Sequence, residues 1–307
     1  MKPVAHEDEA RHEPGNEPLW NESWYADGVS EDGSVGVYAR LGRLPNQDKA
    51  IYTACVCGLD RPTVMLVDGD APLPDAADDT QLVETDRYSA SQRIDEPLGR
   101  FSMQLEGTAA TIADPASILR DDAPAGDPTP VTLDLTWETD GAPFRWPIGN
   151  RYEVPCRIRG TVRVGDETIE IAGPGQRDHS WGARDWWGSD WMWSAFHLED
   201  GTHTHLVTTP AFPGSGIGYV QSGSDLIELR EATSAHEIAR NGLVARDRIE
   251  MPEAELALAV EPIAYGPARL ASDDGRVSHF VRAMSRVRSA DGRSGLGWIE
   301  WNLNQLS

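Results

Sequence analysis

The stretch YEVPCRIRGTVRVGDETIEIA, residues 152–172, decides the fold that this sequence predicts. Apolar and polar side chains alternate on both sides of Gly165-Asp166, which is the period of a strand with one buried face. A glycine-containing pair at the centre is typical of a short hairpin turn. Residues 152–164 and 167–172 are therefore predicted to form an antiparallel hairpin.

The same alternation recurs along the chain and predicts an all-β fold of two tandem antiparallel barrels or sandwiches. Residues 131–137, VTLDLTW, are the clearest single strand. Pro143, Pro147 and Gly149 separate two sets of predicted strands. We therefore expect a flexible acidic tail at residues 1–18, an N-terminal β domain at 19–148 and a C-terminal β domain at 149–307. The expected strands of the second set include residues 190–199, 202–209, 216–221, 226–232, 243–249, 255–263, 277–287 and 295–302.

A second hairpin is predicted around Asp200-Gly201. If these two residues alone form the turn, His197 pairs with Thr204. His203 and His205 then lie together on one face of the hairpin, and His197 lies on the other face. A shift of the register by one residue would reverse this grouping.

Residues 175–187, GQRDHSWGARDWW, are the strongest indication of a functional site. Five of the eleven Trp residues of the chain lie between Trp181 and Trp193. A core of indoles with structural ion pairs is the simpler alternative, but it does not require Asp, His, Ser and Arg in the same run, where burial costs free energy unless each is paired. Aromatic side chains with a few convergent polar groups are typical of a site for a mostly apolar small molecule. The glycines at both ends predict a tight loop that leaves a strand.

Asp178 and His179 are the predicted catalytic residues of this run. Imidazole exchanges a proton near neutral pH, and a carboxyl group enclosed by indoles would be desolvated, which raises its pKa and suits it to protonate a substrate. The neighbouring Arg177 would act on that pKa in the opposite direction. Indole faces can also stabilise a developing carbocation. This chemistry fits the addition of water to an alkene, its reverse, an isomerisation or a cyclisation.

His203 and His205 raise one alternative, because alternate strand residues can chelate a metal with His179 or Asp178 as a third ligand. Solvated or singly hydrogen-bonded histidines are the commoner arrangement, so we assign no metal ligand. No dinucleotide or P-loop motif is present, and no cofactor is expected. The other predicted substrate-binding residues are Arg177, Trp181, Asp185, Trp186, Trp187, Trp193, His205, Trp298 and Glu300.

The chain has a formal net charge of −23, and its hydrophobic content of 39% is sufficient for a packed core. Such a charge repels phosphates, so nucleic acids and anionic membranes are disfavoured as partners. No stretch has the length of a transmembrane helix, which predicts a cytoplasmic protein without membrane insertion. The three cysteines are expected to be buried thiols. The oligomeric state stays open between a monomer and a homodimer.

At residues 175–182 and again at residues 297–302, GWIEWN, the sequence resembles the lipocalin-like superfamily of carotenoid 1,2-hydratases and AttH-like proteins. Those families carry a comparable Asp-His-x-Trp-Gly segment, and the likeness extends over roughly residues 150–307. It implies two tandem lipocalin-like β-barrels with a hydrophobic, isoprenoid- or polyketide-like ligand near their junction. The motif His and Trp of the hydratases fall on His179 and Trp181. Their downstream Tyr and Asp have no counterpart in residues 203–208, HTHLVT.

The sequence therefore predicts a cofactor-independent enzyme for an apolar, terpenoid- or polyketide-like small molecule. It would be a hydro-lyase (a hydratase or dehydratase), an isomerase or a cyclase that works by acid–base chemistry. A non-catalytic carrier of a lipid or metabolite is the first alternative, and a scaffold with a degenerate site is the second.

Overall fold

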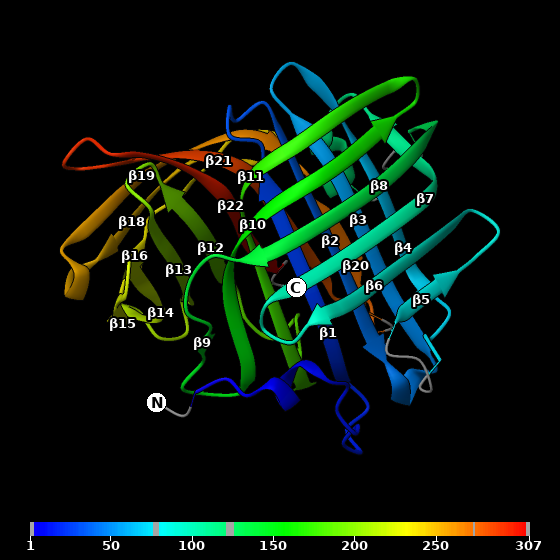
Figure 1. Cartoon of the computed structure of the whole chain (residues 1–307), viewed down its shortest axis with the longest axis horizontal. Coiled ribbons are helices and arrows are strands. Elements are labelled where there is room, and N and C mark those ends of the chain that lie inside the picture. Colours follow the sequence, from blue (N-terminus) through cyan, green and yellow to red (C-terminus); the bar gives the residue numbers. More distant parts are fainter. Residues whose placement is uncertain (1–2, 76–79, 121–125, 273, 305–307) are drawn as a thin grey trace. The chain divides into compact units, whose positions relative to one another are not determined.

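A computed structural model of the chain describes residues 3–75, 80–120, 126–272 and 274–304. Within these residues the regular structure consists of β-strands and four 3₁₀ turns, η1 (His6–Glu9), η2 (Pro45–Gln47), η3 (Pro115–Leu119) and η4 (Pro252–Ala254). The all-β prediction is confirmed: the strands form two large antiparallel sheets (Figure 1). None of the described helical segments has the length and apolar character needed to cross a membrane.

The chain divides into two compact units. Unit 1 contains the described residues of Met1–Val56, Val64–Ile112 and Gly126–Arg184, and unit 2 contains those of Cys57–Thr63, Ala113–Ala125 and Asp185–Ser307. The predicted boundary after residue 148 differs from this division. The reason is that residues 150–183 form two long strands which pair with strands of the first sheet.

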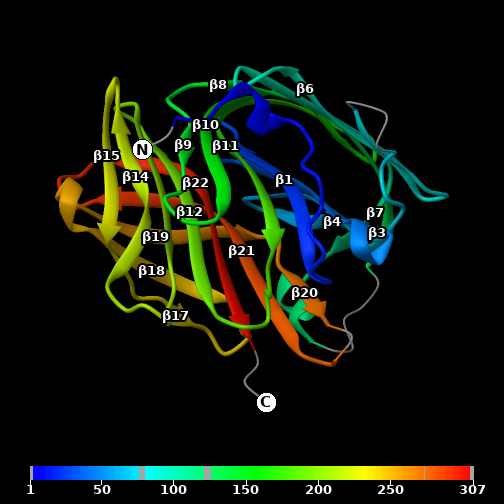
Figure 2. The ribbon, with the colours of Figure 1, turned by 90° about the horizontal axis from the view of Figure 1, so that it is seen from below.

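The first sheet has eleven strands and curls until β4 and β7 pair with each other. Figure 2 shows these strands around the interior of unit 1. Their order is β4-β3-β2-β1-β11-β10-β8-β7-β6-β5, with β9 paired to β10. The strands are β1 (Trp20–Val29), β2 (Val35–Leu44), β3 (Lys49–Gly58), β4 (Arg61–Ala71), β5 (Gln81–Glu84), β6 (Tyr88–Glu96), β7 (Arg100–Ile112), β8 (Asp127–Thr139), β9 (Phe144–Arg145), β10 (Asn150–Val164) and β11 (Glu167–Ala183).

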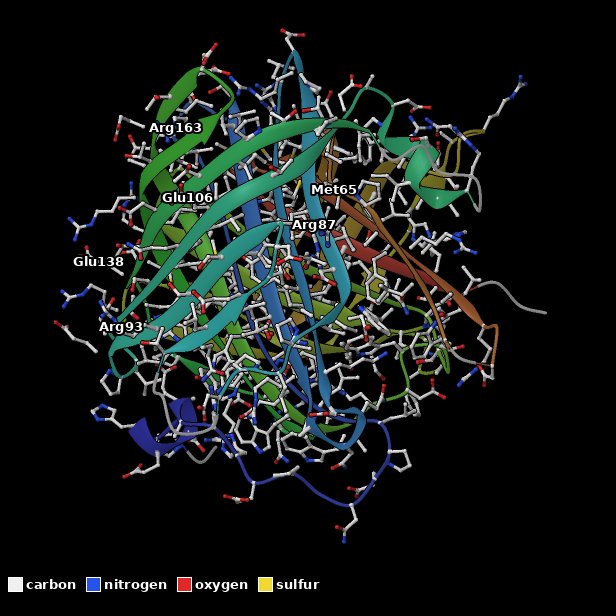
Figure 3. All side chains as sticks on the ribbon, turned by 90° about the vertical axis from the view of Figure 1, so that its right-hand side faces the viewer. Met65, Arg87, Arg93, Glu106, Glu138 and Arg163 are labelled. Atoms are coloured by element: carbon white, nitrogen blue, oxygen red, sulfur yellow. The ribbon has the colours of Figure 1, made fainter. Side chains whose placement is uncertain are left out.

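Alternation along these strands builds the core of unit 1. In β8 the side chains of Val131, Leu133, Leu135 and Trp137 are all buried in one hydrophobic cluster. The side chains between them face the other way, as the strand period requires. Glu106, Glu138 and Arg163 project outward from β7, β8 and β10 (Figure 3). The strand predicted at residues 131–137 is therefore confirmed.

The second sheet also has eleven strands, in the order β15-β14-β13-β12-β22-β21-β19-β18-β16, with β17 paired to β18 and β20 paired to β21. These strands contain most of the residues predicted as strands between 190 and 302, whereas the hairpin at residues 152–172, expected in the same set, lies in the first sheet. They are β12 (Trp191–Leu198), β13 (Thr202–Thr208), β14 (Ser215–Ser222), β15 (Asp225–Glu231), β16 (Thr233–Ser234), β17 (Glu237–Ile238), β18 (Val244–Met251), β19 (Leu256–Tyr265), β20 (Ala268–Ala271), β21 (Val277–Ser289) and β22 (Ser294–Asn304).

The two predicted hairpins have different outcomes. In the first, Val164 pairs with Glu167, so Gly165-Asp166 form the predicted two-residue turn. In the second, His197 pairs with His203, and the predicted register was wrong by one residue.

Gly201 explains the shifted register of the second hairpin. The turn contains three residues, and Gly201 has a φ of +82°. Three-residue hairpin loops characteristically end on a left-handed residue of this kind. His197, His203 and His205 consequently lie on the same face of the sheet, and the predicted separation of His197 from the other two is wrong.

We expect Gly201→Ala to lower the free energy of unfolding by about 1–2 kcal/mol, because a Cβ there forces an L-residue into the left-handed region. A Cβ on Gly201 would meet no atom within 4 Å, so the cost would come from backbone strain alone. Gly69→Ala is the matched control, since its Cβ site is equally open and its φ is not positive. Urea unfolding measures both variants, and equal losses would contradict this explanation.

Candidate functional site

Most of the segment expected to leave its strand as a loop belongs to the second half of β11, which ends at Ala183, and only residues 184–187 lie in the loop that follows. Residues 175–183 pair with β1 on one side, and residues 167–181 pair with β10 on the other. Gly175 does not form a turn. Its missing Cβ allows β1 to lie close to β11, since a Cβ there would be 2.5 Å from the backbone oxygen of Asp27. Because strand neighbours alternate, Asp178 and His179 point to opposite faces of the sheet. The two predicted catalytic residues therefore do not converge on one site.

Arg177, His179 and Trp181 lie on the face of β11 that turns toward the core of unit 1. Residues 5–12, which we call the N-terminal strap, lie along the lower end of the first sheet in Figure 1 and contact this face. Glu9 of the strap is 4% exposed and accepts a hydrogen bond from Arg177 Nη1 at 2.7 Å. It also accepts from the Tyr152 hydroxyl. The expectation of a flexible tail at residues 1–18 thus differs from the structure at the strap.

His179 is fully buried and both of its ring nitrogens face acceptors. Nε2 lies 3.0 Å from Glu22 Oε1, and Nδ1 lies 2.9 Å from the backbone oxygen of Asp8. The ring also stacks on Trp24, with the centroids 4.5 Å apart. Burial raises the pKa of Glu22, but hydrogen bonds from His12 and His179 outweigh it and bring the pKa down to about 2. These contacts hold the imidazole in one orientation.

His12, Glu22 and His179 are the one group of the described residues whose ligand atoms, within 4.8 Å of one another, could hold a metal ion. Hydrogen bonds already account for this spacing: His12 Nδ1 lies 2.9 Å from Glu22 Oε1. Arg43 Nη1 lies 2.7 Å from the other oxygen of the same carboxylate, and a second cation there would be repelled. We therefore interpret the group as a charge network. It contains neither His203 nor His205, the pair that the sequence raised as metal ligands.

Asp178 lies on the opposite face of β11 in a second buried network. Arg151 donates from Nη2 to Asp178 Oδ2 at 2.8 Å and from Nε to Glu153 Oε1 at 2.7 Å, so one guanidinium joins two carboxylates. Gln176 donates to the other oxygen of Glu153 at 3.1 Å. Burial raises the pKa of Asp178 to about 6, with the charge of Glu153 adding to the rise and that of Arg151 opposing it. Asp178 can thus be protonated or ionised near neutral pH.

Four of the predicted residues of unit 2 share one face of the second sheet. Trp193 pairs with Glu300 across β12 and β22, and Trp298 pairs with Ala195, which also pairs with His205. Trp193 and His205 lie with their ring centroids 5.7 Å apart. Glu300 accepts a hydrogen bond from Trp191 Nε1 at 3.1 Å and is ion-paired with Arg282.

The remaining predicted residues of unit 2 precede β12. Trp186 packs against Phe280 in an edge-to-face contact, with the centroids 6.1 Å apart. Trp187 donates from Nε1 to the backbone oxygen of Leu270 at 3.2 Å, and Asp185 pairs with Arg276 at 2.8 Å. Their assignment to substrate binding stays a prediction.

The sequence reasoning missed Arg151, Tyr152 and Glu153, although a signal for them exists. Extending the predicted pairing of Val164 with Glu167 along β10 and β11 places these residues opposite Ser180, His179 and Asp178. No local pattern indicates Glu9 or Glu22, because their partners lie far away in the sequence.

Comparisons with known proteins agree on the fold. A family model with the description "Domain of unknown function (DUF7064)" matches residues 5–305. No curated protein matches the sequence significantly. A protein named as an AttH from Nitrosomonas europaea is similar in structure, with a TM-score of 0.61, 14% identity and 98% coverage of both chains. Kievitone hydratase from Nectria haematococca gives a TM-score of 0.60 at 12% identity, covering 98% of this chain and 93% of its own. CghA is similar in structure with a TM-score of 0.54 at 13% identity, and the match covers 94% of this chain and 88% of CghA. The likeness to the AttH protein and to the hydratase confirms the predicted fold.

Proposed function

The chain belongs to the DUF7064 family, and from this starting point we propose that it is an enzyme which moves protons on an apolar small molecule, with Asp178 as the proton donor. The reaction class is hydration, dehydration, isomerisation or cyclisation. One observation carries the proposal: a buried carboxyl group, Asp178, whose pKa is raised to about 6, is held by Arg151 on a rigid strand. Kievitone hydratase, whose name states a hydration, shares the fold and supports this reading.

The proposed step begins with protonated Asp178. Its carboxyl O–H transfers the proton to one carbon of a substrate double bond, and positive charge develops on the other carbon. Arg151 stabilises the carboxylate that is left. Attack by water, followed by return of a proton to Asp178, completes a hydration. Transfer of a proton from a neighbouring carbon back to the Asp178 carboxylate instead gives an isomer. His179 has a different role in this scheme: buried on the other face, it fixes β11 rather than exchanging protons with the substrate.

The substrate is proposed to be an apolar small molecule of terpenoid or polyketide type. Independently of Asp178, we propose the indoles of Trp186 and Trp187 as contacts for an apolar ligand on unit 2. Trp186→Ala should weaken binding of the ligand about tenfold or more, as expected for the loss of a large aromatic contact. Isothermal titration calorimetry with the isolated ligand measures this, with exposed Phe212→Ala as the control. Equal affinities of the wild type and the Trp186 variant would remove Trp186 from the site.

The proposal is tested on protein purified from its own host. Organic extraction and mass spectrometry identify a bound apolar metabolite, and the metabolite is then incubated with the protein in ¹⁸O-labelled water or in D₂O. Incorporation of labelled oxygen shows hydration, and incorporation of deuterium at carbon shows proton transfer. A bound metabolite that takes up neither label would favour the carrier alternative.

A further inference from the structure

A row of very small side chains crosses β2, β1 and β11 on the Asp178 face. Gly42 pairs with Ser23, Ser23 pairs with Ser180, and Ser180 pairs with Arg151 of β10. Both serines are buried, and their hydroxyl oxygens lie 3.2 Å apart. Since none of the three residues before Arg151 has a bulky side chain, this row leaves room for longer side chains that reach over it.

Three arginines reach this row. Arg40 lies over Gly42 so closely that a Cβ on the glycine would be 2.5 Å from Arg40 Nη1. Arg151 ends the row and binds Asp178. Arg184 approaches from the end of β11 and donates from Nη2 to the backbone oxygen of Ser180 at 3.2 Å. Three guanidinium groups thus approach this row, and the carboxylates of Asp178 and Glu153 pair with one of them, Arg151.

Arg184 is held there by neutral acceptors. Besides the Ser180 backbone oxygen, its Nη2 donates to Asn21 Oδ1 at 3.0 Å. Its Nε is buried and makes no hydrogen bond to the described residues. Burial and the charges of Arg151 and Arg40 lower the pKa of Arg184 to about 9. A bound anion would relieve this unfavourable accumulation of positive charge.

We propose that Arg40, Arg151, Arg184 and the two serine hydroxyls bind a carboxylate group of the substrate. This inference rests on the proposed function and names its substrate class, an apolar organic acid. The planar guanidinium fork matches a carboxylate with two parallel hydrogen bonds, and serine hydroxyls add further donors. Ser180 and Asp178 are two positions apart on the same face, which is about 7 Å. The double bond that Asp178 protonates therefore lies only a few atoms from the carboxylate.

The test compares decanoate with its neutral counterpart decanamide by isothermal titration calorimetry on the full chain. We expect the wild type to bind decanoate about ten- to a hundredfold more tightly than decanamide, the range for hydrogen bonds to charged groups. Arg184→Met should abolish that preference, and Arg40→Met should reduce it. Arg163→Met, an exposed arginine on β10, is the matched control and should keep the preference (Figure 3). Thermal unfolding establishes that each variant is folded before its affinity is interpreted.

Equal binding of the two probes by the wild type would overturn the inference, as would a preference that both the Arg184 and the Arg40 variants retain. Asp178→Asn separates this inference from the proposed function. It removes a neighbouring negative charge, so it should bind decanoate at least as tightly as the wild type does. If it loses turnover while no preference for decanoate exists, the carboxylate site is wrong and the acid role stands. If the preference exists while Asp178→Asn turns over normally, the carboxylate site stands and the acid role is wrong.

Discussion

Replacing Asp178 by Asn is expected to lower turnover of the native substrate by about a hundred- to ten-thousandfold, the usual contribution of a general acid. Asparagine keeps the size of the side chain and accepts a hydrogen bond from Arg151, but it has no acidic proton to give. Steady-state kinetics with the metabolite identified by extraction measures the loss. Asp134→Asn, an exposed aspartate on β8, is the control and should retain wild-type turnover.

The pH dependence gives the same residue a second test. Because the step needs protonated Asp178, kcat/KM should be constant below about pH 6 and fall tenfold per pH unit above it. This limb of the profile should be absent from whatever residual activity the Asn variant has. A profile that instead rises through pH 6 would show that Asp178 acts as a base.

Asp178→Asn should raise the free energy of unfolding although it lowers turnover. The folded-state pKa of Asp178 lies above its ordinary value of 3.8, so the folded protein favours the protonated form and loses stability as the pH rises from about 4 to about 6. Asp178→Asn removes this penalty. Relative to wild type, the variant should therefore gain up to about 3 kcal/mol in unfolding free energy over that interval. A large loss of stability at neutral pH would mean that the activity effect is structural.

The ion pair of the N-terminal strap is the second position where we expect a large effect. Glu9→Gln should lower the free energy of unfolding by about 3–5 kcal/mol, because it leaves Arg177 buried without its counterion. Both side chains are nearly inaccessible, at 3% for Glu9 and 4% for Arg177. Urea unfolding measures the loss. Glu138→Gln, which breaks the exposed pair with Arg159, should cost less than about 1 kcal/mol (Figure 3).

A double-variant cycle and a pH series complete this test. Removing both charges with Glu9→Gln and Arg177→Met should cost less than the sum of the single changes, since neither charge is then left alone. Burial raises the pKa of Glu9, but Arg177 and the hydrogen bonds outweigh it and lower the pKa below 4.5. The pair therefore contributes its full stability above about pH 4.5, and the contribution is lost as the pH falls below that value. Additive single losses would show that Glu9 and Arg177 do not act as a pair.

The sequence by itself determined the class of the fold, most of the strands and the first hairpin. Alternation of apolar and polar residues shows directly that one face of a strand is buried. The Gly165-Asp166 turn sets the register of its own hairpin. That register, followed along the strands, also places Glu153 beside Asp178. The run at residues 175–187 stands out for its density of polar and aromatic side chains, and its role as a site stays a prediction. Its residues 175–183 belong to a strand rather than to the expected loop.

Only the tertiary structure decided how these residues are grouped. Whether Asp178 and His179 converge depends on β11 being held between β1 and β10, which are distant in sequence, and pairing on both sides forces the two side chains apart. One extra residue in the turn at Gly201 similarly moved His197 to the face of His203. The ion pair of Glu9 with Arg177 joins residues 168 positions apart. Contacts over such separations leave no periodic trace in the chain, because their geometry is fixed by the closure of the sheet rather than by neighbouring residues.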